Sequence, residues 1–281
     1  LDAVAVPHAG LLILDGTAPH IVDPEIPGAR DSIINLGVCL NEAAMRPHLP
    51  HIRVCMADHA ACSRRARACL AAAAALARNH AAVLCAAADN ARMARMTHAL
   101  IQSVLSQKGE TSAVPSVRPI LTDAVTPKGE LCLIGENAQP RVFRLLAHWG
   151  MDMTPILREI SLAARMAGYD VEEHLCPTVP DRLLHLTIPA LGTLITSSDI
   201  LPSEQTFDFS SCIPQGALLR YECALEQGRA GIRLHLHRAI AALTQAKQLH
   251  DELESFYVPN MDFGRWQEIL EETLDTLQPA D

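Results

Sequence analysis

Short apolar runs alternate with helical patterns in the second half of the chain. Apolar runs bounded by turn-forming residues predict strands over residues 131–134, 142–146, 171–174 and 192–196. Between two of these strands, apolar residues recur at helical spacing and predict a helix over 154–167. Because strands alternate with a helix, the pattern predicts an α/β fold with a parallel sheet.

Two longer regions predict helices that follow each α/β part. Residues 52–107 are rich in Ala, Leu, Met and Arg, which favour helix, and a break near 78–80 would make them a helical hairpin. Residues 217–257 predict a second long helix that Pro259 ends, and residues 263–277 predict a last helix. Two glycines, Gly228 and Gly231, are expected to kink the long helix or to divide it.

A short repeat links the beginning of the chain to its second half. Residues 1–14 align without gaps on residues 183–196. Each copy leads through irregular, proline-rich sequence into a long helical region, so we expect two related units. The identical pairs are Leu1/Leu183, Pro7/Pro189, Gly10/Gly192, Leu12/Leu194 and Ile13/Ile195.

The repeat suggests where the two units begin and end. Residues 108–119 are rich in turn formers and predict a linker, so the units would span 1–107 and 118–281. The first unit would contain only the end of an α/β part, with the counterpart of residues 118–182 lying before Leu1. A parallel sheet that lacks its central strand exposes a wide apolar face. We therefore expect either a chain truncated upstream or one sheet shared by both units.

Residues 142–160 have the outline of a phosphate-binding loop: an apolar strand, a turn and a helix. In a working loop, glycine N–H groups wrap the phosphates, a lysine reaches the β/γ oxygens and a Ser/Thr hydroxyl binds Mg²⁺. Gly150 and Thr154 fit this pattern as nucleotide-binding candidates. Met153 stands where the lysine should be and Asp152 where a glycine should be, so the loop is predicted to be degenerate.

An acidic residue ends the apolar strand of the first copy. In P-loop proteins an Asp at such a strand end holds Mg²⁺, usually through water, although Asp also starts turns in unrelated proteins. Asp15 is therefore a candidate metal ligand. The proline-rich loop that follows would bring His20 and Asp23 to the same sheet edge, as a general base, a metal ligand or a sensor of the γ-phosphate. Alternatively, His20 hydrogen-bonds backbone in a rigid structural loop. Asp15, His20 and Asp23 are the catalytic candidates.

Composition narrows the class of protein and its partners. Hydrophobic residues make up 49% of the chain and charged residues 20%, which is typical of a folded globular protein. The net charge of -9 argues against nucleic acid as a partner. The nine cysteines lack regular spacing, and no apolar run spans a membrane, so we expect reduced thiols, a cytoplasmic location and no membrane partner.

Cys55, His59 and Cys62 share a helix face and offer a zinc site as an alternative to buried apolar thiols.

Two segments are distinctive: LDGTAPHIVDPEIPGARDSIINLG at 14–37 and YVPNMDF at 257–263. Together with the segments at 124–129, 168–176, 188–191 and 249–254, they resemble an uncharacterised bacterial family of ATPase-like proteins, of Bacillus and clostridial type, with two P-loop domains in tandem. The resemblance implies a tandem P-loop fold with ATP and Mg²⁺ as cofactors, and a first phosphate loop upstream of Leu1. This chain departs from the family pattern at its second loop, where the lysine is missing.

Two functions follow as hypotheses. The first is an ATP-binding, ATPase-like protein with a degenerate nucleotide site, in which hydrolysis by this chain alone is not expected. The second is a non-catalytic module that uses the inherited fold to bind a protein partner or a second copy of itself.

Overall fold

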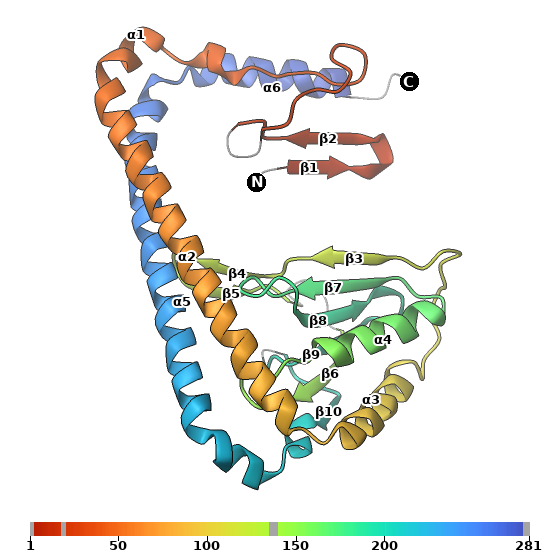
Figure 1. Ribbon diagram of the computed structural model, residues 1–281. Coiled ribbons are helices and arrows are strands. Elements are labelled where there is room, and N and C mark those ends of the chain that lie inside the picture. The colour runs from red at the N-terminus through yellow and green to blue at the C-terminus, as the bar shows by residue number, and fades with distance from the viewer. Residues whose placement is uncertain (1–2, 18–20, 135–139, 200, 278–281) are drawn as a thin grey trace. The chain divides into compact units, whose positions relative to one another are not determined.

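The computed structural model describes residues 3–17, 21–134, 140–199 and 201–277, and the chain forms two compact units. Unit 1 comprises residues 1–56 and 250–281, and unit 2 comprises residues 57–249. Figure 1 shows their elements with the labels used below. The predicted α/β class is confirmed by a six-stranded sheet with helices in unit 2.

Unit 2 is built on a mixed sheet with the strand order β10-β6-β9-β8-β7-β3. Strands β10, β6 and β9 are parallel and β3 is parallel to β7, whereas β8 is antiparallel to both of its neighbours. The prediction of a parallel sheet is therefore wrong, because the links on either side of β8 are too short for a parallel crossover. The strands are β3 (Val117–Ile120), β6 (Arg141–Leu146), β7 (Val171–Leu175), β8 (Leu183–Ile188), β9 (Thr193–Thr196) and β10 (Gln205–Asp208).

The two faces of this sheet have different covers. Leu186 and Ile195 are cross-strand partners on one face and are fully buried in the main core. That core includes residues of α3 (Asn90–Val104) and α4 (Thr154–Met166), which lie beside the sheet (Figure 1). The other face carries Leu194, which packs with Ile134 and Cys132 in a smaller cluster. Cys132 ends the antiparallel hairpin of β4 (Asp123–Thr126) and β5 (Gly129–Cys132), so this hairpin contributes to the second cover.

Two long helices continue through the positions at which breaks were predicted. Helix α2 (Leu49–Ala87) runs without interruption through residues 78–80 and is followed by Asp89. The Asp89 carboxylate accepts a hydrogen bond from Arg92 N at 3.0 Å and so caps α3. A second helix therefore follows the first, as predicted, but the break lies at Ala88 and Asp89, about ten residues later than the sequence indicated, where a capping Asp is available.

Helix α5 (Gln215–Tyr257) is likewise continuous, so the glycines do not divide it. A Cβ atom at Gly228 would lie 2.9 Å from His80 Nδ1, and one at Gly231 would lie 2.9 Å from Leu76 Cδ1. Both glycines thus allow α5 to approach α2 closely within unit 2. Small residues serve the same purpose on α2, where Ala73 is fully buried.

Unit 1 contains a hairpin with the same design as β8 and β9. Strands β1 (Ala3–Val6) and β2 (Leu11–Leu14) are antiparallel, and Val4 pairs with Ile13 just as Leu186 pairs with Ile195. In each hairpin a one-turn 3-10 helix starts at a proline and ends at a left-handed glycine, Gly10 (φ 61°) or Gly192 (φ 53°). The structure therefore confirms the repeat found in the sequence, down to the pairing register.

The two hairpins differ in how far their apolar residues are covered. On β9, Leu194 and Ile195 are 1% and 0% exposed. Their counterparts on β2, Leu12 and Ile13, are 59% and 40% exposed. The difference arises because β8 and β9 lie inside a six-stranded sheet, whereas β1 and β2 form a two-stranded sheet of their own.

Each unit also contains a 3-10 helix from one copy of the sequence repeat. This 3-10 helix accepts a hydrogen bond from the residue that precedes a helix of the other copy. In unit 2, Asp89 N, just before α3, donates to Cys212 O in the 3-10 helix Phe209–Cys212 at 2.8 Å. In unit 1, Asp262 N, just before α6 (Phe263–Leu277), donates to Cys39 O in the 3-10 helix Leu36–Cys39 at 2.8 Å. Asp262 Oδ1 also caps α6 by accepting from Arg265 N at 3.0 Å. The remaining elements of unit 1 are α1 (Glu42–Met45) and the 3-10 helices Arg46–His48 and Val258–Asn260.

Candidate functional site

The predicted strand–turn–helix consists of β6, the turn that follows it and α4, all in unit 2. Gly150 adopts φ 79°, a left-handed conformation that favours glycine, and Met151 N donates to His148 O at 3.0 Å to close the turn. Helix α4 begins at Thr154, as the sequence indicated. Gly150 and Thr154, the two candidate nucleotide-binding residues, are therefore brought to one turn at the end of a buried strand.

A histidine from α2 packs directly against this turn. His80 Nε2 donates to Trp149 O at 3.0 Å, and a Cβ atom on Gly150 would lie only 2.6 Å from His80 Cδ2. Burial lowers the pKa of His80, and the nearby charges of Arg229 and Arg182 lower it further. The hydrogen bond to Trp149 O raises the pKa, but the net effect is a lowered value. The lowered pKa favours the neutral imidazole, which donates to the backbone of the turn and packs against Gly150.

The N-terminus of α4 already carries a negative partner. Asp152 Oδ1 accepts from Thr154 N at 3.0 Å, and Asp152 Oδ2 lies 3.3 Å from Arg182 Nε. The Thr154 hydroxyl accepts from Leu183 N at 3.0 Å and is buried, so it is engaged in joining α4 to β8. A helix N-terminus attracts anions because of its free N–H groups and dipole. Here a side-chain carboxylate occupies that position, and the residues present do not fit a nucleotide phosphate.

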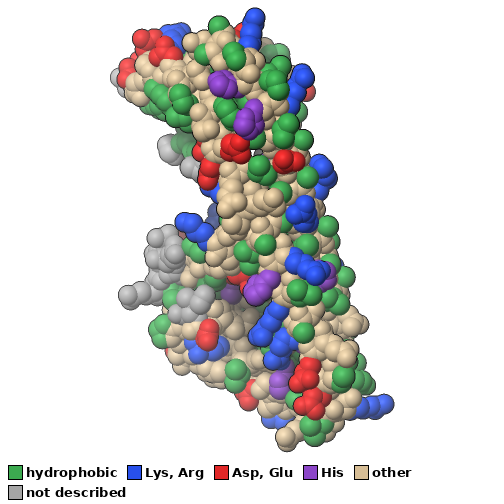
Figure 2. All heavy atoms as spheres, turned by 90° about the vertical axis from the view of Figure 1, so that its left-hand side faces the viewer, with side chains coloured by type: hydrophobic (Ala, Val, Ile, Leu, Met, Phe, Trp, Pro, Cys, Tyr) green, Lys and Arg blue, Asp and Glu red, His purple; other side chains and the backbone are tan. Residues whose placement is uncertain are grey.

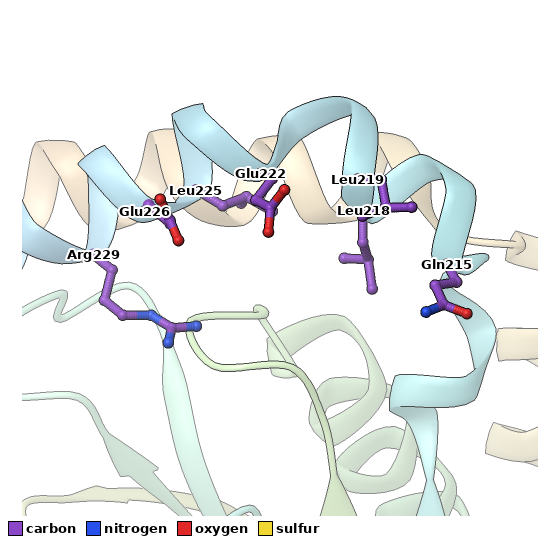
Figure 3. Close-up of a pocket in the computed structure, with 7 residues that line it drawn as sticks. All are labelled: Gln215, Leu218, Leu219, Glu222, Leu225, Glu226 and Arg229. Atoms are coloured by element: carbon purple, nitrogen blue, oxygen red, sulfur yellow. The ribbon is translucent and has the colours of Figure 1, made fainter.

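Trp149, on the outer side of the turn, lies under two arginines of α5. Arg229 Cζ is 5.0 Å and Arg233 Cζ 5.9 Å from the centre of the indole ring. Figure 3 shows Arg229 at one end of a row of α5 side chains that line an open pocket of about 350 Å³. Glu222 and Glu226 line the same pocket and would repel an anionic ligand.

In unit 1, Asp15 follows β2 directly and holds a local turn. Its Oδ1 atom accepts from Thr17 N at 2.9 Å and from Thr17 Oγ1 at 2.7 Å, both at an exposed position. Asp23 is exposed in the loop that follows. His20 lies outside the described residues, so the arrangement of the three catalytic candidates stays a prediction.

The same loop is organised by a residue that the sequence did not single out. Asp31 Oδ2 accepts from Glu25 N and Ile26 N, each at 2.9 Å, and Arg30 bonds both Asp31 and Glu25. The hydrogen bond from Arg30 and those from the backbone lower the pKa of Asp31 to about 2. This network fixes the turn at Gly28, which has φ 78°.

A buried polar cluster in unit 2 also went unpredicted. His185 Nε2 lies 3.2 Å from Asp123 Oδ2, and Cys132 Sγ is near both. Burial raises the pKa of the Cys132 thiol to about 11, and the adjacent Asp123 adds to the effect. Although burial opposes it, the hydrogen bond from His185 lowers the pKa of Asp123. Burial, together with His185, lowers the pKa of the neighbouring His174 to about 4. No sequence motif joins these residues; only the strand register brings them together.

The helical zinc site considered from the sequence does not form as expected. Cys55 and Cys62 are buried, which fits small apolar residues on a helix. Within the described part of the chain, Cys55 lies with His51 and Glu252, and the metal-compatible groups include neither His59 nor Cys62.

Surface features bear on the expected partners. On the face drawn in Figure 2, basic, acidic and apolar side chains are interspersed. The stretch 42–87 is the one described helix that is long and apolar enough to cross a membrane, judged by length and composition alone. Ala66 and Ala73 within it are buried against protein, so packing accounts for part of its apolar character. The cytoplasmic location and the absence of a membrane or nucleic-acid partner stay predictions.

Comparison with known proteins adds no relative. Neither models of protein families, nor curated proteins, nor solved structures gave a match to this chain.

Proposed function

We propose that this chain is a P-loop-like protein of the ATPase-like class that does not hydrolyse ATP in unit 2 and that acts as a protein-interaction module. The closed turn supports the first part. His80 bonds the backbone of the turn and packs against Gly150, the Asp152 carboxylate bonds the start of α4, and the Thr154 hydroxyl is engaged with Leu183 N. No lysine is present in the turn to reach a phosphate.

The interaction module is carried by one observation: two hairpins with the same register have opposite exposure. Leu12 is 59% exposed where its counterpart Leu194 is 1% exposed, and Val4 is 46% exposed where Leu186 is fully buried. Exposed apolar residues that adjoin free strand edges mark a surface for pairing with another segment. We call β1 and β2 with these residues the hairpin surface.

The pairing of the equivalent hairpin in unit 2 supports one kind of segment as the occupant of this surface. There, β9 pairs with β6 in parallel and β8 pairs with β7 in antiparallel fashion. By equivalence, β2 accepts a parallel strand and β1 an antiparallel strand. The occupant is thus an α/β segment of the same construction as residues 141–175, with a helix that packs on the face of Val4 and Ile13. The interaction follows the principle of strand addition, in which main-chain hydrogen bonds supply affinity and side-chain pockets supply specificity.

The repeat allows a direct test of the hairpin surface. A second copy of residues 117–182 would be fused in front of Leu1, which reproduces the native continuation of residue 182 into Leu183. We expect the amides of β1 and β2 to gain hydrogen-exchange protection, because the fused strands cover both edges. The same fusion carrying Ile13→Lys is the matched control and should gain none. If the amides of β1 and β2 exchange equally fast with and without the fused segment, the proposed surface is wrong.

Binding of ATP and Mg²⁺ at Asp15 is a second candidate, favoured by the position of that residue. In unit 2, β6 is parallel to β9, so the turn after β6 lies at the same sheet edge as the end of β9. The equivalent edge of β2 ends in Asp15, whereas β9 is followed by Ser197. A segment that carried an intact phosphate loop would therefore place that loop beside Asp15, the residue type that holds Mg²⁺ in such proteins.

Titration with Mg·ATP separates the two candidates. A ligand at 100 times its Kd stabilises the folded state by about 2.7 kcal/mol. The second candidate predicts a stabilisation of unit 1 that Asp15→Asn removes. The interaction module without nucleotide predicts no change in either unit, and stabilisation of unit 2 by Mg·ATP would contradict the closed turn.

A further inference from the structure

The polar cluster on the second face of the sheet brings three different metal-ligand types together. Asp123 and Cys132 are directly opposite each other at the open end of the β4–β5 hairpin. His185, on β8, lies opposite His174 on β7 and Thr196 on β9. The ligand atoms of Asp123, Cys132 and His185 all lie within 4.8 Å of one another. Hairpin and sheet thus contribute to one site within unit 2.

The surroundings orient the three ligands. His185 Nδ1 lies 2.6 Å from Thr196 Oγ1, which leaves Nε2 directed at Asp123. Thr122 Oγ1 donates to Asp123 Oδ2 at 3.0 Å. Metal-binding histidines almost always use their second nitrogen in such a bond, and metal-binding carboxylates are likewise hydrogen-bonded. The side chains of His185 and Asp123 are only 4% and 13% exposed, so the site is shielded from bulk water.

We propose that Asp123, Cys132 and His185 form a zinc site, with Cys132 Sγ, His185 Nε2 and a carboxylate oxygen of Asp123 as the ligands. Thiolate, imidazole and carboxylate are the three side-chain types that bind zinc, and tetrahedral coordination suits separations of this size. Binding replaces the direct His185–Asp123 hydrogen bond with two metal bonds, and the proton on His185 Nε2 moves by way of solvent to Nδ1, which then donates to Thr196 Oγ1. The Cys132 thiol loses its proton to solvent as the Zn–S bond forms.

Three protein ligands leave the fourth tetrahedral position for water or a small ligand. His174 does not supply it in the present arrangement, because its Nδ1 bonds Thr122 Oγ1 at 3.0 Å and its Nε2 bonds Thr187 Oγ1 at 2.9 Å. Zinc sites with an open position are the kind that activate water or polarise a ligand, whereas closed four-ligand sites are structural. The structure therefore points to a site that can bind an exogenous donor.

Cobalt titration of the full chain tests this assignment. After removal of metal with a chelator, Co²⁺ is added and then displaced by Zn²⁺. We expect one equivalent of Co²⁺ to give the visible bands of a tetrahedral ion and a thiolate-to-cobalt charge-transfer band. Cys132→Ser should abolish the charge-transfer band. The matched controls are Cys85→Ser, at an exposed thiol, and Cys55→Ser, which removes the alternative group with His51 and Glu252. Both control variants should keep it.

A variant that leaves all three ligands intact separates metal binding from folding. Thr196→Val removes the bond to His185 Nδ1 and should weaken zinc binding by about 10- to 100-fold, the usual effect of losing such a partner. The fluorescence of Trp149 reports that unit 2 remains folded. Absence of tetrahedral cobalt bands in the parent chain, survival of the charge-transfer band in Cys132→Ser, or unchanged affinity in Thr196→Val would each overturn the assignment.

Discussion

Two isoleucines at the same position of the repeat provide a sharp test of the fold. Ile13 and Ile195 are identical in sequence and occupy the same place in the pairing register. Truncation of each to alanine removes the same atoms from the same local backbone. Any difference between Ile13→Ala and Ile195→Ala therefore reports the surroundings of the side chain and not its intrinsic strand preference.

The structure predicts very different magnitudes. Ile195 is 0% exposed and lies in the main core, so its truncation leaves a cavity and should lower the free energy of unfolding by about 2–5 kcal/mol. Ile13 is 40% exposed on a two-stranded hairpin, so its truncation should cost less than about 1 kcal/mol.

The two tryptophans allow each unit to be followed separately. Trp149 belongs to unit 2 and Trp266 to unit 1, and the chain has only these 2. Urea unfolding of Ile195→Ala would be followed in a Trp266→Phe background, which leaves Trp149 as the reporter. Ile13→Ala would be followed in a Trp149→Phe background. The unfolding midpoint is the quantity compared with each parent.

Equal losses in the two variants would refute the reasoning. If Ile13→Ala costs as much as Ile195→Ala, then β1 and β2 are as well covered as β8 and β9, and the hairpin surface does not exist. If Ile195→Ala costs less than 1 kcal/mol, the core assigned to α3, α4 and the sheet is wrong.

Two further predictions concern the turn between β6 and α4. Because the pKa of His80 lies below its ordinary value of 6.5 in the folded state, the unfolded chain binds the proton first as pH falls. The stability of unit 2 should thus be full above pH 6.5 and decrease below it, and His80→Gln should flatten this decrease in urea titrations; an unchanged slope would contradict the neutral imidazole. Gly150→Ala should cost about 3 kcal/mol, from left-handed backbone strain and collision with His80, against about 1 kcal/mol for Gly10→Ala, which has open space around it. Thermal unfolding checks both substitutions. Similar losses of stability would show that the His80 side chain moves aside to accommodate the new methyl group.

Local features were predictable because they depend on neighbouring residues. The bend at Gly150, the start of α4 at Thr154 and the last helix all follow from apolar spacing and turn chemistry. The repeat found in residues 1–14 is matched by equivalent registers in the two hairpins, although the pairing of β1 with β2 was not predicted. The helix break was misplaced because the weak helix formers Asn79 and His80 are overridden by packing against α5, where Gly228 accommodates His80.

The contents of the candidate sites could not be predicted, because they depend on contacts distant in sequence. The missing lysine indicated that the turn is degenerate, but nothing local showed that His80, on another helix, packs against it. The cluster of Asp123, Cys132 and His185 depends on which strand residues face each other, and a shift by one residue would place them on opposite faces.

Each unit combines a 3-10 helix from one copy of the repeat with a helix from the other copy, and this has a consequence for folding during synthesis. Unit 1 combines residues before 57 with residues after 249, so residues 57–249 are synthesised before Asp262 N can donate to Cys39 O. Unit 2 is a continuous stretch and can fold earlier. During that interval the 3-10 helix Leu36–Cys39 lacks its partner from the other copy, while Leu12 and Ile13 stay exposed, so this part of unit 1 presents apolar surface to which a chaperone can bind.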